Sequence, residues 1–163
     1  MGFAHPESLK VTVLREPIDR IVSHYFFAQR DRNHYLYPKI HEQKLSLAKY
    51  VSSGISGELQ NWYTTHFSGM NLMELSKEPE RALEMAMYNL TSQYDLVGVL
   101  EKYEDFIDKL RKISGLKVAY PKRRFNVTHG RPQLDSLDEA TIEIIKQFNQ
   151  LDISLYERIR KSI

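Results

Sequence analysis

The chain has 163 residues, of which 42% are hydrophobic and 27% charged, so residues 1–163 are expected to form one globular domain rather than a disordered or bilayer-spanning chain. It has no cysteine, which excludes disulfides, thiolate metal sites and cysteine nucleophiles. The formal charge of +2 excludes no class of partner, so only the distribution of charge is informative.

The best-specified local structure is a strand, a tight turn and an amphipathic helix at residues 10–28. Residues 10–14 read Lys-Val-Thr-Val-Leu, a β-branched and apolar run that is typical of a strand. Pro17 suits the first turn of a helix, where its missing N–H costs nothing. The apolar residues that follow have helical spacing: Ile18, Ile21, Val22, Tyr25 and Phe26.

Two polar side chains of this unit are candidate anion ligands. Ligands of open α/β sheets bind outside the carboxyl end of a strand, which is where Arg15 stands. Its guanidinium can hold a phosphate through two parallel hydrogen bonds, and the hydroxyl of Ser23 could add another contact. The simpler alternative, which the residues alone favour, pairs Arg15 with Glu16 or Asp19 and leaves Ser23 as an ordinary helix-surface residue.

The middle of the chain predicts helices and loops. Residues 29–44 are polar and rich in His and Tyr, which indicates a surface loop. Short helices are expected around residues 45–53 and 57–67, on either side of a Ser/Gly cluster. Pro79 opens a further helix with an apolar face.

A second strand is predicted at residues 95–99, followed by a helix that ends at Gly115, a typical C-cap residue. Residues 136–139 form a capping-box pattern ahead of the final stretch, which is one long helix or two joined near Asp152. Strands separated by helices indicate an α/β fold with parallel pairing, although only two strands are visible.

The basic residues are concentrated in one segment. Residues 109–134 contain eight Lys and Arg and no acidic residue, whereas the rest of the chain has 15 basic and 21 acidic residues. A local positive field of this kind attracts anions. Because the run continues through Pro and Gly residues of an expected loop, an anion site is favoured over a solvated helix end, and nucleic-acid binding stays an alternative.

The sequence contains no motif of a metal site, a serine hydrolase or a phosphate-binding loop. The six histidines show neither a His-Glu-x-x-His motif nor a pair four residues apart, so no metal site is expected. A Gly-x-Ser-x-Gly elbow and a phosphate-binding Gly-rich loop are also missing.

Residues 11–25 resemble the 3′-phosphate motif of sulfotransferases that use 3′-phosphoadenosine-5′-phosphosulfate (PAPS). The branch related to heparan sulfate 2-O-sulfotransferase and its bacterial homologues is the most similar. The family pattern T-x-L-R-[DE]-P-x-x-R-x-x-S-x-Y matches its Arg to Arg15 and its Ser to Ser23. Further similar segments extend the resemblance over nearly the whole chain: 59–69, 97–99, 124–132 and 149–156.

The resemblance implies an α/β, P-loop-kinase-like sulfotransferase core with a parallel sheet, here N-terminally truncated and rich in helix. It implies PAPS as co-substrate, adenosine 3′,5′-bisphosphate as product, and transfer of a sulfuryl group to a carbohydrate hydroxyl. The basic segment 122–131 would close over the nucleotide, and His5 would substitute for the family's catalytic base. The implied nucleotide ligands are Arg15, Ser23, Arg124, Asn126, Thr128 and Arg131.

The family's 5′-phosphosulfate loop is not found ahead of Arg15, so residues 1–163 are interpreted as one partial sulfotransferase domain. The alternative function is a non-catalytic module that binds adenosine 3′,5′-bisphosphate or an anionic glycan. A missing central strand would expose a sheet edge, which favours self-association or a complementing chain. No signal-peptide pattern or membrane partner is indicated, and the compartment stays open, with the cytoplasm expected for a bacterial source.

Overall fold

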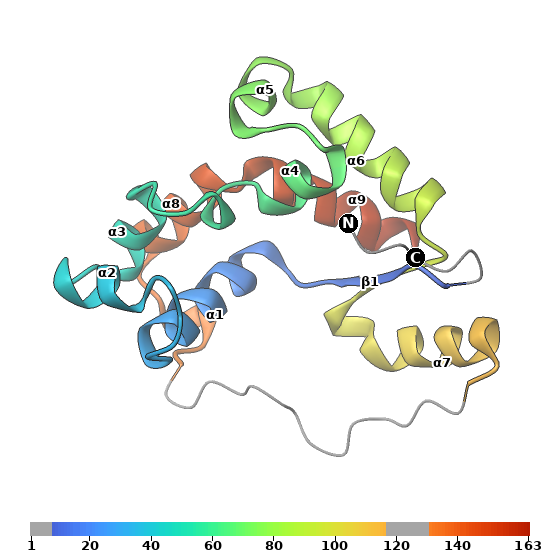
Figure 1. Cartoon of the computed structure of the whole chain (residues 1–163), viewed down its shortest axis with the longest axis horizontal. Coiled ribbons are helices and arrows are strands. Elements are labelled where there is room, and N and C mark those ends of the chain that lie inside the picture. Colours follow the sequence, from blue (N-terminus) through green and yellow to red (C-terminus); the bar gives the residue numbers. More distant parts are fainter. Residues whose placement is uncertain (1–7, 117–130) are drawn as a thin grey trace.

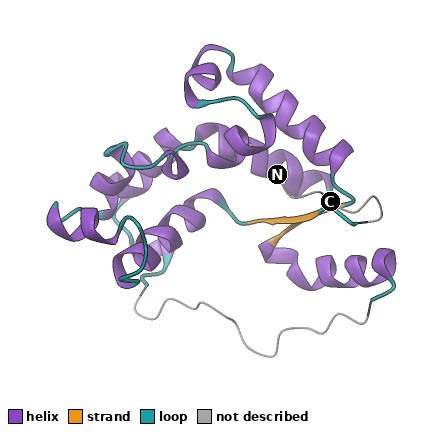
Figure 2. Cartoon of the chain, viewed as in Figure 1, coloured by secondary structure: helices purple, strands orange, loops and turns teal. Residues whose placement is uncertain are grey.

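The computed structural model describes residues 8–116 and 131–163, and the fold is predominantly helical (Figure 2). Its elements, in chain order, are β1 Val11–Leu14, α1 Pro17–Arg30, α2 Tyr37–Glu42, α3 Leu47–Ser52, η1 Gly57–Leu59, α4 Trp62–Ser68, α5 Leu72–Lys77, α6 Pro79–Gln93, β2 Leu96–Val99, η2 Leu100–Lys102, α7 Tyr103–Ser114, η3 Leu134–Ser136, α8 Glu139–Phe148 and α9 Gln150–Ser162.

The two strands pair in parallel, in the register Val11 with Leu96 through Leu14 with Val99. Parallel pairing needs a crossover between the strands, and here the crossover contains α1 to α6. The expected α/β arrangement is therefore confirmed at the level of a helix-rich chain with a small parallel sheet. The larger P-loop-kinase-like core stays a prediction.

Helices lie on both sides of this sheet (Figure 1). On one side, Leu14 and Val99 pack with apolar residues of α4, α6 and α9. On the other side, α7 packs against β2, and the ring of Phe106 lies directly over Gly98. A second core forms away from the sheet, where α1, α2, α3 and α8 bury their apolar faces together.

Helix α1 begins as the sequence predicts. Pro17 occupies its first turn, and the Glu16 side chain accepts a hydrogen bond of 2.7 Å from the backbone N–H of Asp19. The apolar positions Ile21, Val22 and Tyr25 are buried. Asp19, Arg20 and Ser23 lie on the other faces of α1, where their polar side chains can contact other segments of the chain.

Two local predictions are wrong, and a third, two helices in the final stretch, is confirmed with its junction displaced by three residues. Residues 29–44 contain the end of α1 and helix α2 in place of a continuous loop. The cap of α8 is the Asp138 side chain, which accepts from the Thr141 N–H, in place of a capping box at residues 136–139. The final stretch is two helices, but they meet at Asn149 rather than near Asp152.

The helix before Gly115 ends there as predicted, with that glycine at φ +67°. Among the residues that the structure describes, no helix is both long enough and apolar enough to cross a bilayer.

Candidate functional site

The structure brings the two predicted side chains of residues 10–28 into contact at the carboxyl end of β1. Nη1 of Arg15 donates a 2.9 Å hydrogen bond to Oγ of Ser23. The spacing of eight residues corresponds to about two helical turns, so a long side chain that starts before the helix can lie along it and reach that far. The Arg15 side chain keeps 32% of its surface exposed, so the guanidinium is accessible to an anion from solvent.

A third predicted residue joins this pair through Asp19. Nε of Arg15 donates to one carboxylate oxygen of Asp19, and Nη2 of Arg131 donates to the other. Arg131 follows the undescribed part of the basic segment and lies 112 residues from Asp19 in the sequence. The site therefore has two guanidiniums that share one carboxylate, beside a hydroxyl.

Charges of both signs surround this group. Burial lowers the pKa of Arg15, and burial and then the neighbouring Arg15 lower the pKa of Arg131. Both stay charged, because arginine keeps its proton in proteins. Two further carboxylates have other partners: Glu16 caps α1, and Glu101 accepts a hydrogen bond from the Tyr156 hydroxyl.

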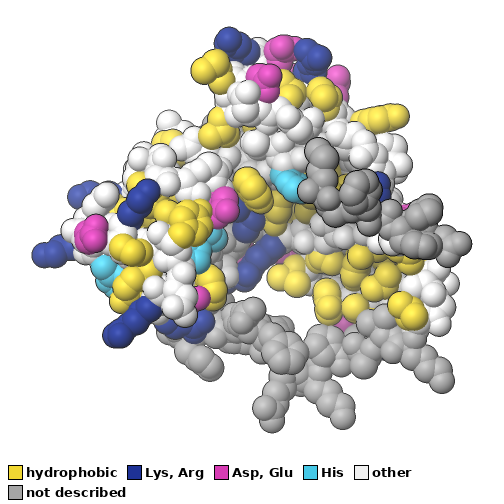
Figure 3. Space-filling view, in the orientation of Figure 1, with side chains coloured by type: hydrophobic (Ala, Val, Ile, Leu, Met, Phe, Trp, Pro, Cys, Tyr) yellow, Lys and Arg dark blue, Asp and Glu magenta, His cyan; other side chains and the backbone are white. Residues whose placement is uncertain are grey.

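Lys and Arg side chains gather at the centre of the face shown in Figure 3, near the point where β1 leads into α1 in Figure 1. Apolar side chains lie on either side of them. This face therefore places cations beside apolar surface.

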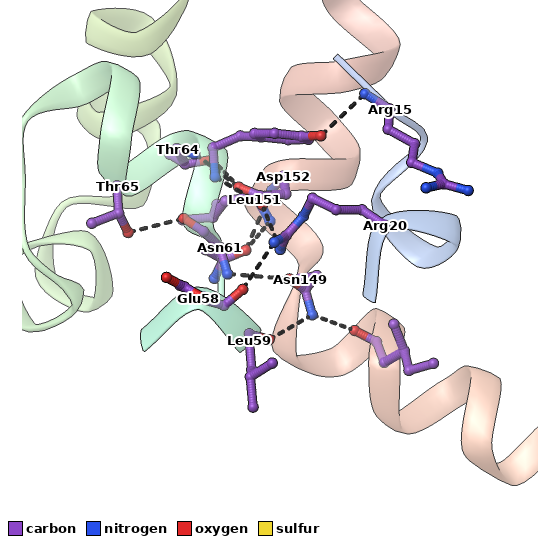
Figure 4. A network of polar contacts seen from close by, with 12 residues as sticks. Arg15, Arg20, Glu58, Leu59, Asn61, Thr64, Thr65, Asn149, Leu151 and Asp152 are labelled. Carbon is purple, nitrogen blue, oxygen red and sulfur yellow. Dashed lines mark hydrogen bonds and ion pairs between the residues drawn. The ribbon is translucent and has the colours of Figure 1, made fainter. Parts of the chain in front are cut away.

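The backbone of Arg15 is held separately from its side chain. Its N–H donates a 3.1 Å hydrogen bond to the Tyr63 hydroxyl, while its guanidinium points away from the buried contacts (Figure 4). Burial raises the pKa of Tyr63 above its ordinary value, so its hydroxyl stays protonated well beyond physiological pH. Tyr63 thus fixes the end of β1 without using the groups that could bind a ligand.

Tyr63 is positioned at the start of α4, where side chains at the starts of α4 and α9 accept hydrogen bonds from each other's backbone N–H groups (Figure 4). The buried Asp152 carboxylate, on α9, accepts hydrogen bonds from the backbone N–H groups of Tyr63 and Thr64 at the start of α4. In return, Oδ1 of Asn61, which precedes α4, accepts from the N–H groups of Leu151 and Asp152 at the start of α9.

Arg20 links this capping network to α1. Its Nη2 lies 3.7 Å from the Asp152 carboxylate, its Nη1 donates to the backbone oxygen of Glu58, and it sits 5.1 Å from the centre of the Tyr63 ring. Asn149 completes the network by accepting from the Asn61 N–H and donating to Leu59 and Ile145. The network joins segments that are far apart in the sequence and lies directly behind Arg15.

Comparison with known proteins identifies the family. The model of the sulfotransferase family matches residues 3–157. The chain belongs to this sulfotransferase family. Relatives include heparan sulfate 2-O-sulfotransferase 1 of Gallus gallus, Xenopus laevis and Homo sapiens, at 35%, 34% and 33% identity over 102 residues. The resemblance inferred from residues 11–25 is thus confirmed.

The match to these relatives covers 60% of this sulfotransferase-family chain but only 29% of the length of each relative. The family is shown by the match of its model to residues 3–157, and the activity of the much longer relatives does not transfer with it. The function of the chain is therefore argued below as a proposal.

Three of the seven predicted site residues lie among the residues that the structure describes. Arg15, Ser23 and Arg131 lie together at the end of β1. The other four predicted residues lie outside the described residues, and their roles stay predictions: His5, Arg124, Asn126 and Thr128. In residues 8–116 and 131–163 no three His, Asp or Glu side chains converge as metal ligands.

Sequence reasoning missed the residues that position the site. Asp19 entered only as an alternative partner of Arg15, and the structure shows that Arg15 contacts Asp19 and Ser23 at once. Tyr63, Asn61 and Asp152 had no local signal beyond belonging to segments that resemble the family. Their contacts are long-range, so only the folded chain reveals them.

Proposed function

We propose that this chain is part of a sulfotransferase that moves the sulfuryl group of PAPS to a hydroxyl of a carbohydrate acceptor, with residues 1–163 forming one partial domain. The observation that carries the proposal is the Arg15–Ser23 contact at the solvent-accessible end of β1, in a chain that belongs to the sulfotransferase family. Relatives named for heparan sulfate support a carbohydrate acceptor.

In this proposal, Arg15 and Ser23 hold the 3′-phosphate of the nucleotide. The guanidinium neutralises that phosphate, and a charge-assisted hydrogen bond contributes about 1.5–3 kcal/mol. Arg131 supplies a second positive charge to the same anion. The four predicted residues outside the described part would act on the nucleotide and, for His5, on the acceptor proton.

When bound, PAPS supplies the sulfuryl group and leaves as adenosine 3′,5′-bisphosphate. The new bond joins the acceptor oxygen to sulfur as the bond from sulfur to the 5′-phosphate oxygen breaks, and the hydroxyl proton passes to a base. By analogy with phosphoryl transfer, the protein contributes mostly positioning and charge stabilisation.

Calorimetric titration tests the nucleotide site. Wild-type protein should bind adenosine 3′,5′-bisphosphate more tightly than adenosine 5′-monophosphate, which lacks the 3′-phosphate. Arg15→Gln should weaken bisphosphate binding by roughly ten- to a hundredfold, because a charge-assisted contact is lost. Ser23→Ala should weaken it less.

Arg158→Gln is the matched control, because it removes one positive charge from an exposed pair with Glu80 on α6. Equal binding of the two nucleotides, or an equal loss in R158Q and R15Q, would contradict the proposed site. RNA binding with a steep salt dependence in place of nucleotide binding would favour a nucleic-acid partner.

Turnover separates the enzyme from the alternative. Transfer of labelled sulfate from PAPS to a carbohydrate acceptor by the purified chain would establish catalysis. Nucleotide binding that depends on Arg15, with no transfer to any glycan, would instead support the non-catalytic module.

We also propose that the two-stranded sheet pairs with another copy or a complementing chain. Within the described residues each strand has one paired edge, and Val11 on β1 is exposed. Unpaired strand edges favour such pairing. Light scattering should then give a mass above that of a monomer, and a monomer mass at every concentration would contradict self-association.

A further inference from the structure

Asp19 is the residue that brings two distant arginines to the same place. One of its oxygens accepts from Arg15 at the end of β1, and the other accepts from Arg131. The side chains of Asp19 and Arg131 are only 24% and 16% exposed. Within residues 8–116 and 131–163, this contact with Asp19 is what ties Arg131 to α1.

Without a carboxylate between them, the two guanidiniums would repel each other. Burial is the main cause of the lowered pKa of Arg131, and the charge of Arg15, which is this repulsion, is the second. Removing one member of a partly buried charged cluster leaves the remaining charges uncompensated, which is strongly unfavourable. Asp19 is therefore what allows both arginines to stay in the site before a ligand arrives.

Arg131 also retains a donor for a ligand. Its Nε is buried and has no hydrogen-bond partner within residues 8–116 and 131–163. Buried N–H groups without partners are rare in proteins and call for an explanation, and an anion oxygen at this position would satisfy the group. The bridge through Asp19 thus leaves spare hydrogen-bonding capacity on the second arginine.

We propose that Asp19 is a positioning residue of the anion site, which holds Arg131 against Arg15 so that both guanidiniums face one phosphate. The identity of the anion, the nucleotide 3′-phosphate, rests on the proposed function. The bridge itself rests only on the contacts of Asp19 with the two arginines.

The sign of the effect of Asp19 on binding depends on Arg131. A carboxylate close to the site repels a phosphate across solvent, an effect of about two- to fivefold. A positioned arginine attracts the phosphate by roughly tenfold or more. If Asp19 positions Arg131, its loss must therefore weaken binding overall, whereas without Arg131 only the repulsion and the contact of Asp19 with Arg15 remain.

The test measures adenosine 3′,5′-bisphosphate affinity in wild type, Asp19→Asn, Arg131→Gln and the double variant. We expect Asp19→Asn to weaken binding about fivefold when Arg131 is present. In the Arg131→Gln background the same change should leave affinity unchanged or increase it. Asp19→Glu, which keeps the charge, should retain most of the wild-type affinity.

A merely structural role would reduce affinity equally in both backgrounds, and that outcome would overturn the proposal. An increase of affinity in Asp19→Asn alone would also overturn it, because Asp19 would then compete with the ligand. If wild type binds no nucleotide, the proposed function fails, and the unfolding midpoints of the same four proteins without ligand still test the bridge. Non-additive midpoints support the bridge, and additive midpoints contradict it.

Discussion

The backbone and the side chain of Arg15 contact different residues, so the contribution of each contact can be tested by a separate substitution. Its N–H donates to Tyr63, and its guanidinium contacts Asp19 and Ser23. A substitution at Tyr63 therefore changes how the strand end is held while it leaves the ligand-facing groups in place.

We expect Tyr63→Phe to lower the free energy of unfolding by about 1 kcal/mol, because the Arg15 N–H loses its acceptor. Nucleotide affinity should fall several-fold as the Arg15 backbone becomes less constrained. Urea unfolding and calorimetric titration check the two effects. Tyr88→Phe, at a tyrosine that is 68% exposed, should change neither quantity, and an equal loss at both tyrosines would contradict the role of Tyr63.

His24 gives the chain a defined pH dependence of stability. Its Nδ1 lies 2.9 Å from the hydroxyl of the fully buried Tyr50, and its Nε2 lies 3.1 Å from the Glu58 carboxylate. Burial lowers the pKa of His24, while Glu58 opposes the shift and His34 and Arg20 add to it. The folded protein therefore takes up this proton less readily than the unfolded chain.

Because the unfolded state binds the proton first, the free energy of unfolding should fall as the pH drops below about 6.5, the ordinary pKa of histidine. Above that pH the contribution of His24 is complete. Urea unfolding between pH 7.5 and 5.5 measures the slope, which His24→Gln should flatten. An unchanged slope in that variant would assign the pH dependence to other groups.

At the scale of elements, the sequence predicts those helices whose start and end depend on neighbouring residues. The apolar spacing after Pro17 and the glycine at the end of α7 were sufficient to predict α1 and the stop at Gly115. The spacing from Arg15 to Ser23 placed both side chains as ligands of one anion, but their direct contact with each other was not predicted.

Other features depend on contacts across the molecule. Helix α8 ends before Asn149, whose side chain forms hydrogen bonds with Leu59, Asn61 and Ile145. No sequence pattern near residue 149 indicates these bonds. Helix α5 was missed although Asn71 and Glu74 form its capping box, because the helix has only six residues. Arg131 could be predicted as a basic loop residue, but not as a partner of Asp19.

The packing of α7 on the sheet depends on the absence of a side chain at Gly98. A Cβ atom there would lie 2.5 Å from Cδ2 of Phe106, too close for any ordinary contact. Gly98→Ala should therefore push α7 away from β2 and lower the free energy of unfolding by about 1–3 kcal/mol.

Gly57→Ala is the matched control, because a Cβ atom there meets nothing within 4 Å. Chemical unfolding compares the two variants. Equal stability of Gly98→Ala and wild type would mean that the contact between α7 and β2 is not closely packed in solution.

At the scale of the whole molecule, the two hydrophobic cores meet where α8 leads into α9. Ile145 on α8 belongs to the core around α1 and α3, and Leu155 on α9 belongs to the core under the sheet. Asn149 stands between them and bonds to both sides of the junction. We therefore expect the cores to unfold together.

Trp62 allows this coupling to be measured, because it is the only tryptophan in the chain. It lies on α4, the helix that contributes Phe67 to the core under the sheet. Ile145→Ala removes fully buried atoms from the other core and should cost about 2–5 kcal/mol. In a coupled protein this lowers the thermal midpoint of Trp62 fluorescence by roughly 5–15 °C, together with that of far-ultraviolet circular dichroism.

Ile113→Ala, at an exposed position of α7 that belongs to neither core, controls for the loss of an isoleucine and should shift both midpoints by only a degree or two. A fluorescence midpoint that stays at the wild-type value while circular dichroism separates into two transitions would show that the cores unfold independently. Coincident shifts mean that the two cores unfold as one unit, so that the core around α1 and α3 contributes to the stability of the end of β1, where the Arg15 site lies.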